Sequence, residues 1–439
     1  MEHRPDTVPE DTLLFDLPLD EDLPTVGKKS PAAERSMDEF PPKKQTPPTP
    51  DPMGDIPSSE EDDSPTVVPQ PKRKRKSCWT VVWAVSKFIW KLALALVLIV
   101  GILLFGMVGF LTVTEYNPAF AETADRGSVN RTETIVNRSL SLLSFNTGYA
   151  GLGADADFFM DGGEGVLPAE EASVQENMEG IQKLLSLTDT DFIFLQEVDT
   201  DSQRSFNTNQ WLKYEKELKD YESRFALNHS CSYVPYPFTQ PMGKIHSGIA
   251  TYSSYDIVSA TRYSLPNPFS WPTRIANLKR CLLVTRIPIE DSEQQLVLIN
   301  VHMEAYDDGS GKSEQTRQLI SLVKEEYAKG NYVIAGGDFN QSFPESDAFP
   351  VKDPQLWTPG VLTRISDGFK YCYDDSTPTC RLLNQPYDPD SEDTQFYVID
   401  GFLVSPNITI DRVETLDYDF LYSDHNPVLL EFTLNADTE

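Results

Sequence analysis

The sequence predicts a mixed α/β domain that is preceded by one transmembrane helix and a disordered tail. Three features predict this organisation. Residues 1–71 are rich in Pro, Ser, Thr and acidic residues and have almost no apolar periodicity. Residues 92–114 form one uncharged apolar run. Residues 141–434 alternate short apolar runs with amphipathic stretches, which is the pattern of strands mixed with helices.

The N-terminal segment, residues 1–71, is predicted to be disordered. A segment with so few apolar residues cannot bury enough surface to offset the entropy that is lost on ordering. The segment could carry short docking motifs, but a solvated acidic and Pro-rich tail is the simpler interpretation.

The apolar run from Leu92 to Thr114 contains 23 residues without a charge. A helix of that length reaches about 35 Å, which exceeds the roughly 30 Å hydrocarbon core of a bilayer. The preceding juxtamembrane segment, residues 72–91, combines the basic run Lys72–Lys76 with three tryptophans. This combination predicts a cytoplasmic N-terminus and an extracytoplasmic C-terminal region. A cleaved signal peptide fits poorly, because about 90 residues precede the apolar run.

Residues 115–140 are predicted to form a polar stalk, and residues 435–439 a short C-terminal tail. The chain has a formal net charge of −31, and so acidic a surface repels phosphate backbones at long range. Avid non-specific DNA binding is therefore not expected. Outside the cytoplasm, Cys372 and Cys380 are the best candidates for a disulfide, with unpaired buried thiols as the alternative.

Seven short apolar runs after residue 140 are predicted to be buried strands. They are Leu142–Phe145, Phe192–Leu195, Leu282–Thr285, Leu296–Val301, Tyr332–Ala335, Tyr397–Val404 and Val428–Phe432. Apolar side chains at helical spacing predict one helix over Val174–Leu185, and Thr316–Ala328 is a second helix candidate. The whole region predicts sheets that are covered by helices.

Acidic, amide and histidine side chains recur at the ends of these predicted strands. The motifs are Ser144-Phe145-Asn146, Gln196-Glu197, Asn300-Val301-His302, Gly337-Asp338-Phe339-Asn340, Ile399-Asp400-Gly401 and Ser423-Asp424-His425. Each motif alone is a weak signal, because Gly, Asp and Asn also favour ordinary turns. Six such motifs in one order are much harder to explain as solvated turns.

This set of residue types suits the hydrolysis of a phosphate ester. Carboxylates that gather at the mouth of a sheet repel one another unless a cation lies between them. Mg²⁺ prefers oxygen ligands and keeps several waters, so one or two carboxylates with an amide oxygen suffice to hold it. The reaction also needs a base for the attacking water and charge neutralisation at the phosphate oxygens. A histidine beside an aspartate can serve in either role.

The ordered motifs resemble the endonuclease/exonuclease/phosphatase superfamily, which includes deoxyribonucleases, neutral sphingomyelinases and inositol phosphatases. The resemblance covers about residues 141–434, and the Gln-Glu, Gly-Asp-Phe-Asn and Ser-Asp-His elements are specific as a set. It implies a four-layer α/β/β/α sandwich, with two sheets face to face and helices outside. It also implies in-line attack of water on phosphorus, without a covalent enzyme intermediate.

The resemblance implies a metal site for Mg²⁺, with Mn²⁺ as a substitute. Asn146 and Glu197 match the metal ligands of the family, and Glu197 matches the main ligand. Asp424 matches an additional carboxylate on the metal side.

The resemblance also implies catalytic roles for five residues. Asp338 matches the residue that orients or deprotonates the attacking water, and Asn340 matches its phosphate-binding neighbour. His302 matches a histidine that lies against the phosphate. His425 matches a second histidine, which acts as a base or stabilises the phosphate, and Asp400 matches the carboxylate that orients it.

Other residues are candidates for contact with the substrate. His246 or Ser247 could make the contact that the family places before a Gly-led strand, with a partly buried loop histidine as the alternative for His246. Arg204 and Arg317 could bind phosphate, although surface ion pairs are their simpler interpretation. The loop Phe158–Gly163 could line the site, although packing by its own aromatic side chains is the simpler interpretation.

Two classes of function follow from these residues. The first is a metal-dependent hydrolase of phosphate esters, phosphodiesters above all, that acts outside the cytoplasm; its substrate could be a nucleic acid, a lipid, or a sugar or inositol phosphate. The alternative is a catalytically silent, membrane-anchored binding or scaffold protein that retains the fold. No motif residue is lost, which favours the hydrolase.

Overall fold

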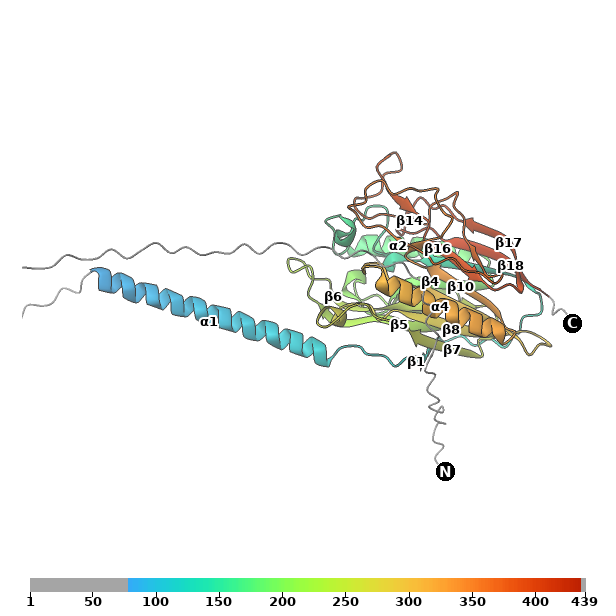
Figure 1. The fold of residues 1–439 in the computed structure, drawn as a ribbon, viewed down its shortest axis with the longest axis horizontal. Helices are drawn as coiled ribbons and strands as arrows, with labels where there is room; N and C mark the ends of the chain where they lie inside the picture. Colours follow the sequence, from blue (N-terminus) through green and yellow to red (C-terminus); the bar gives the residue numbers. More distant parts are fainter. Residues whose placement is uncertain (1–77, 436–439) are drawn as a thin grey trace, which may run out of the picture. The chain divides into compact units, whose positions relative to one another are not determined.

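The computed structural model describes residues 78–435 (Figure 1). The predicted disordered tail, residues 1–71, lies outside the described residues, as do residues 72–77 of the juxtamembrane segment and residues 436–439.

The first described element is α1, a single helix of 36 residues over Cys78–Val113. It begins well before the apolar run at Leu92, because the Trp- and Val-rich residues of the juxtamembrane segment continue the same helix. A helix of this length reaches about 54 Å at 1.5 Å per residue. By length and composition it is long and apolar enough to cross a membrane.

The described chain then forms two large mixed sheets of seven strands each, together with two small two-stranded sheets. The first large sheet contains, in spatial order, β1 (Ala121–Thr123), β7 (Ser259–Ser264), β8 (Cys281–Pro288), β9 (Gln295–His302), β10 (Tyr332–Asp338), β16 (Asp400–Val404) and β13 (Lys370–Cys372). The second contains β17 (Ile408–Thr415), β18 (Val428–Leu434), β3 (Ser139–Asn146), β4 (Phe192–Asp199), β6 (Gly243–Ser253), β5 (Glu222–Val234) and β2 (Asp125–Arg126). The small sheets pair β11 (Gln341–Ser342) with β12 (Gly360–Val361) and β14 (Cys380–Arg381) with β15 (Phe396–Tyr397).

The two large sheets lie face to face, and a helix covers the outer side of each. Alternate residues of a strand point to opposite faces, so Leu142 joins the core between the sheets while its neighbour Leu143 joins the core beneath a helix. That helix is α2 (Glu171–Leu187), and the short α3 (Gln210–Glu217) packs beside it. On the other sheet α4 (Ser310–Ala328) packs its apolar side onto β9 and β10 (Figure 1). The expected α/β/β/α sandwich is therefore confirmed.

Strand register places several motif residues at the neighbouring ends of paired strands. Strands β9 and β10 are parallel, and Asp338 pairs with His302. Strands β10 and β16 are antiparallel, and the same Asp338 pairs with Asp400. In the second sheet the parallel pair β3–β4 places Asn146 opposite Gln196. Motifs that are far apart in the sequence thus end side by side.

All seven predicted strands are present, with small changes in their bounds. The run predicted over Tyr397–Val404 is interrupted, because Phe396–Tyr397 pairs in a small sheet of its own and β16 starts at Asp400. Strands β5, β6, β7 and β17 were not predicted. Several polar residues occupy buried positions of β5 and β6, whereas β7 and β17 have only two buried residues each. Helix α4 begins at Ser310, six residues earlier than predicted.

Two further features differ from the sequence-based expectations. Cys372 and Cys380 are buried free thiols, so the alternative to a disulfide is correct. The segment 115–140, predicted as a polar stalk, contributes β1 and β2, which pair with β7 and β5 at the edges of both large sheets.

Candidate active site

The ends of the central strands of both sheets surround a cavity of about 750 Å³. Most of the predicted site residues line it: Glu197, His302, Asp338, Asn340, Asp424 and His425, together with the substrate-contact candidate Ser247. The other two metal-ligand and catalytic candidates, Asn146 and Asp400, lie directly behind this lining and hydrogen-bond to it. The structure therefore gathers every metal-ligand and catalytic candidate at one place.

Asp338 lies at the centre of this cluster, between two histidines. Its Oδ2 atom is 3.6 Å from Nε2 of His302 and 3.9 Å from Nε2 of His425. Nε2 of His302 is also 3.8 Å from Oε1 of Glu197, and Nε2 of His425 is 3.9 Å from Oδ2 of Asp424. Two imidazoles and three carboxylates thus face a shared space.

The Gly-Asp-Phe-Asn turn fixes the Asp338 carboxylate. The backbone N–H of Asn340 donates to Oδ1 at 2.8 Å, and its side-chain amide donates to Oδ2 at 3.2 Å. Asn146 donates a further hydrogen bond to Oδ2 at 3.0 Å. Asn340 has φ of 50°, in the left-handed region that Asn tolerates better than most residues. A side chain at Gly337 would collide with the carbonyl of Val301, so the turn also needs this glycine.

The three carboxylates that face the cavity all bind protons more readily than usual. Burial, together with the nearby Asp400 carboxylate, raises the pKa of Asp338 to about 7. Burial also raises the pKa of Glu197, and repulsion from Asp424 adds to that effect. The pKa of Asp424 is raised by its own burial. A cation between these groups would relieve both their desolvation and their repulsion.

The donor set fits a hard divalent cation. Glu197, Asp338 and Asp424 offer carboxylate oxygens, and Asn146 offers an amide oxygen, which are the ligand types that Mg²⁺ prefers. Two groups of possible ligand atoms, each within 4.8 Å of one another, occur among the described residues: Asp338, Asp400 and His425, and Cys380, Asp424 and His425. Glu197, the main ligand implied by the family resemblance, belongs to neither group, although it lines the same cavity.

The two histidines have opposite protonation preferences. Burial lowers the pKa of His302 well below its usual value, and the nearby Arg280 guanidinium lowers it further. Burial also acts to lower the pKa of His425, but the adjacent Asp400 carboxylate outweighs it and holds the pKa well above the usual value. At neutral pH, His302 is therefore neutral and His425 carries a proton on both nitrogens.

Several functional candidates are placed differently from their sequence-based interpretation. His246 does not line the cavity; it lies partly buried in β6, and its Nδ1 is 2.6 Å from Oγ1 of Thr200. Arg204, expected on the surface, is buried and lines the cavity. Arg317 does form an exposed ion pair, with Glu314. The loop Phe158–Asp161 lines the cavity, and its Phe158 and Phe159 rings also pack against each other.

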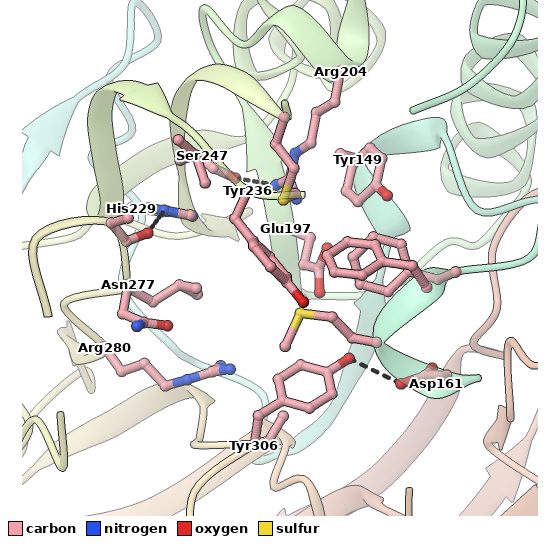
Figure 2. A pocket seen from close by; sticks show the side chains of 18 of the residues that line it. Tyr149, Asp161, Glu197, Arg204, His229, Tyr236, Ser247, Asn277, Arg280 and Tyr306 are labelled. Atoms are coloured by element: carbon pink, nitrogen blue, oxygen red, sulfur yellow. Dashed lines mark hydrogen bonds between the residues drawn. The ribbon is translucent and has the colours of Figure 1, made fainter. Parts of the chain in front are cut away.

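Arg204 forms a tightly held unit beside the metal candidates (Figure 2). Its guanidinium donates two hydrogen bonds to Asp199, at 3.0 and 3.1 Å, and one to Oγ of Ser247 at 3.3 Å. The guanidinium also lies 3.7 Å from the ring centroid of Tyr149. Arg204 thus supplies positive charge close to Glu197 and lowers the pKa of that carboxyl against the effect of burial.

Sequence reasoning missed several polar residues of the cavity, among them Arg280 and Tyr306, and it named Asp161 only within the loop Phe158–Gly163. Figure 2 shows these three residues around its lower half. Arg280 precedes strand β8 and is almost fully buried, with Nε 3.4 Å from Oε2 of Glu304. The Tyr306 hydroxyl donates to Asp161 at 3.1 Å, and burial raises the pKa of Asp161 to about 7. Arg280 lies at a strand start and Tyr306 in a loop, so a search of strand ends could not find these two residues.

The fold and this cluster define the class of protein. An α/β/β/α sandwich with buried carboxylates and two histidines at its strand ends is the architecture of a phosphoric ester hydrolase. The chain belongs to the Endonuclease/Exonuclease/phosphatase family, whose sequence model matches residues 143–425.

The chain also resembles several solved structures at low sequence identity. A Beutenbergia cavernae endonuclease/exonuclease/phosphatase is 17% identical, with 68% of this chain and 72% of that chain covered and a TM-score of 0.48. A Bacteroides thetaiotaomicron family protein is 18% identical, with 68% and 99% covered and a TM-score of 0.44. The human Nocturnin catalytic domain with bound sulfate is 15% identical, with 71% and 97% covered and a TM-score of 0.40. A search among curated proteins finds no match.

Proposed function

We propose that this protein is a metal-dependent hydrolase of phosphate esters, phosphodiesters above all, that acts outside the cytoplasm. The observation that carries the proposal is the position of Asp338. It lies within 4 Å of both His302 and His425 and is held by hydrogen bonds from Asn146 and Asn340. A purely structural aspartate would not need two histidines around it in a cavity.

Each residue has a chemical role in the attack of water on phosphorus. Asp338, with its pKa raised to about 7, can accept a proton from the attacking water at neutral pH. His425, protonated and held by Asp400, can donate a hydrogen bond to a phosphoryl oxygen as negative charge develops there. Neutral His302 and the amide of Asn340 can position the phosphate without adding charge.

The metal-ligand candidates are Glu197, Asn146 and Asp424. A bound divalent cation would neutralise the phosphate oxygens and polarise the P–O bond. We propose Mg²⁺, with Mn²⁺ as a substitute, because the donor atoms are oxygens and the family generally uses divalent metals.

The extracytoplasmic location rests on α1 and the residues before it. The helix has the length and composition of a membrane span, and the basic run Lys72–Lys76 precedes it. By the positive-inside rule the catalytic domain lies on the far side of the membrane from the N-terminus.

The activity is tested with full-length protein, bis(p-nitrophenyl) phosphate and added Mg²⁺ or Mn²⁺. We expect turnover that stops on chelation and is lost in the Asp338→Ala, His425→Ala double variant. If wild type does not exceed this variant across both metals and a panel of natural esters, the silent scaffold protein is the correct reading.

The orientation has a separate test. Protease added to intact cells should remove an epitope placed after Glu439 and spare one placed at Met1. The reverse pattern would contradict the proposed location.

A further inference from the structure

The cavity that holds the catalytic residues continues to the end of α1. Leu104, Met107, Val108 and Leu111 of this helix line it. Their spacing of three, four and seven residues places them on one face of the helix. The neighbouring Leu103 is absent from this lining. The side of α1 that faces the active site is therefore an apolar wall.

Loops from the catalytic domain complete this apolar part of the cavity. They are Phe158–Met160, Pro235–Phe238 and the segment from Phe269 to Leu278. Several of their aromatic side chains are exposed to solvent: Phe238 to 79%, Tyr236 to 56% and Trp271 to 54%. Exposed aromatic residues beside a spanning helix are typical of the membrane interface. The mouth of the cavity thus has the surface of a membrane-contacting site.

Polar contacts hold the end of α1 against this mouth. Nε1 of Trp271 donates to Oγ1 of Thr112 at 3.1 Å. Glu115, just after the helix, accepts from Lys279 at 2.9 Å and lies 3.2 Å from Arg274. Leu111 is only 6% exposed and belongs to an apolar cluster with Val234 and other cavity residues. The C-terminal end of α1 is therefore part of the cavity wall.

The charged groups that line the cavity all come from the catalytic domain rather than from α1. Arg204 and Arg280 provide positive charge near Glu197, and Figure 2 shows Arg204 in its upper part and Arg280 with Tyr306 in its lower half. A small soluble phosphate ester would use these charged groups alone and leave the apolar wall exposed to water. An amphiphile with an apolar chain and a phosphate group would match both the charged groups and the apolar wall.

Resting on the hydrolase activity proposed above, we propose that the substrate is a membrane lipid phosphodiester. Its apolar chains lie along the Leu104–Leu111 face and the aromatic loops, and its phosphate reaches His302, Asp338 and His425. The oxygen of water bonds to phosphorus as one P–O ester bond breaks, and Asp338 takes the proton of the water. The leaving oxygen gains a proton, so the products are an alcohol and a phosphomonoester.

The test compares two substrates with the full-length protein in detergent micelles containing Mg²⁺. One is the soluble diester bis(p-nitrophenyl) phosphate. The other is lipid in mixed micelles of phosphatidylcholine, phosphatidylethanolamine, phosphatidylglycerol and sphingomyelin, with the released alcohols and phosphomonoesters measured by mass spectrometry. We expect turnover of both substrates. Turnover of the soluble diester without any lipid turnover would overturn the lipid inference and leave the hydrolase proposal standing. Turnover of neither would contradict the hydrolase itself.

Matched variants test the apolar wall. Leu104→Gln changes the cavity face of α1, and Leu103→Gln is its control on the same helix. Phe238→Asp changes the exposed mouth, and Leu187→Asp is its control, because Leu187 is 71% exposed and lies at the end of α2. We expect each cavity variant to lose at least tenfold more lipid turnover than soluble-diester turnover, and the controls to keep the wild-type ratio. Equal ratios in cavity and control variants would overturn the assignment of the wall.

Discussion

The Nδ1 atom of His425 lies 2.8 Å from Oδ2 of Asp400, and both side chains are buried. The two residues come from different segments: Asp400 opens β16, and His425 lies just before β18. The contact leaves Nε2 of His425 directed toward Asp338 and Asp424, 3.9 Å from each. Asp400 thereby sets both the orientation and the charge of the histidine.

Asp400→Asn should lower kcat by about 10²–10⁴-fold, the usual range for a misplaced or wrongly protonated catalytic group. The Asp400 carboxylate raises the pKa of His425, so its removal lowers that pKa. His425 then loses its proton at a lower pH, so the alkaline limb of the pH–rate profile should move to lower pH. The measurement is kcat against pH for both proteins. The exposed Asp393→Asn is the control, and an unshifted alkaline limb in Asp400→Asn would contradict the role.

Mg²⁺ or Mn²⁺ should raise the melting temperature of the wild-type protein, because an ion that binds only the folded state stabilises it by mass action. A free metal concentration of about 100 times Kd stabilises the folded state by about 2.7 kcal/mol. This stabilisation raises the melting temperature by several degrees for a domain of this size. Glu197→Gln should reduce this metal-induced shift, whereas Glu314→Gln, in an exposed ion pair, should retain it. Thermal melts with and without metal and chelator give the answer. An equal shift in all three proteins would place the metal elsewhere.

Arg204→Met should lower the free energy of unfolding by about 3–5 kcal/mol, because it leaves the Asp199 carboxylate buried without its partner. Asp199 is fully buried and accepts two hydrogen bonds from this guanidinium. Arg317→Met removes an exposed ion pair and should cost at most about 1 kcal/mol. Urea unfolding of the two variants measures the contrast. Similar losses would mean that the buried pair contributes no more than the exposed one.

Acid should remove a stabilising contribution from Glu326. Hydrogen bonds from Arg286 and Lys329 outweigh burial and lower the pKa of this carboxyl to about 2. A folded-state pKa below the unfolded value gives stability that is present above about pH 4.5 and is lost as the pH falls toward 2. Unfolding free energies of wild type and Glu326→Gln should therefore differ at pH 7 and converge as the pH falls. A difference that grows in acid would contradict this sign.

The catalytic cluster could be predicted from the sequence because its acidic, amide and histidine side chains lie at or next to the ends of recognisable strands. Asn146, His302 and Asp338 each end a strand whose apolar run is easy to recognise. Asp424 and His425 lie just before another such strand. Parallel pairing then brings these ends together.

The remaining cavity residues could not be predicted in the same way. Arg280 and Tyr306 come from a strand start and a loop, and only the tertiary structure places them at the cavity. Arg204 resembled a surface arginine, since nothing nearby in the sequence showed that Asp199 would be buried beneath it. The contact of one face of α1 with the cavity could not be predicted either. The residues around the whole helix are apolar, so the sequence does not distinguish one face from another.

The strands β1 and β2 lie close to the end of α1, and this closeness limits how the protein can work. Only residues 114–120 separate Val113 from Ala121, so the connection spans at most about 25 Å. With α1 in a membrane and a lipid substrate, as proposed above, a domain on so short a tether would not travel into the bulk solution or reach an opposing membrane. It would meet substrates that diffuse laterally in its own bilayer, so its rate should follow the mole fraction of lipid in that surface rather than the bulk lipid concentration.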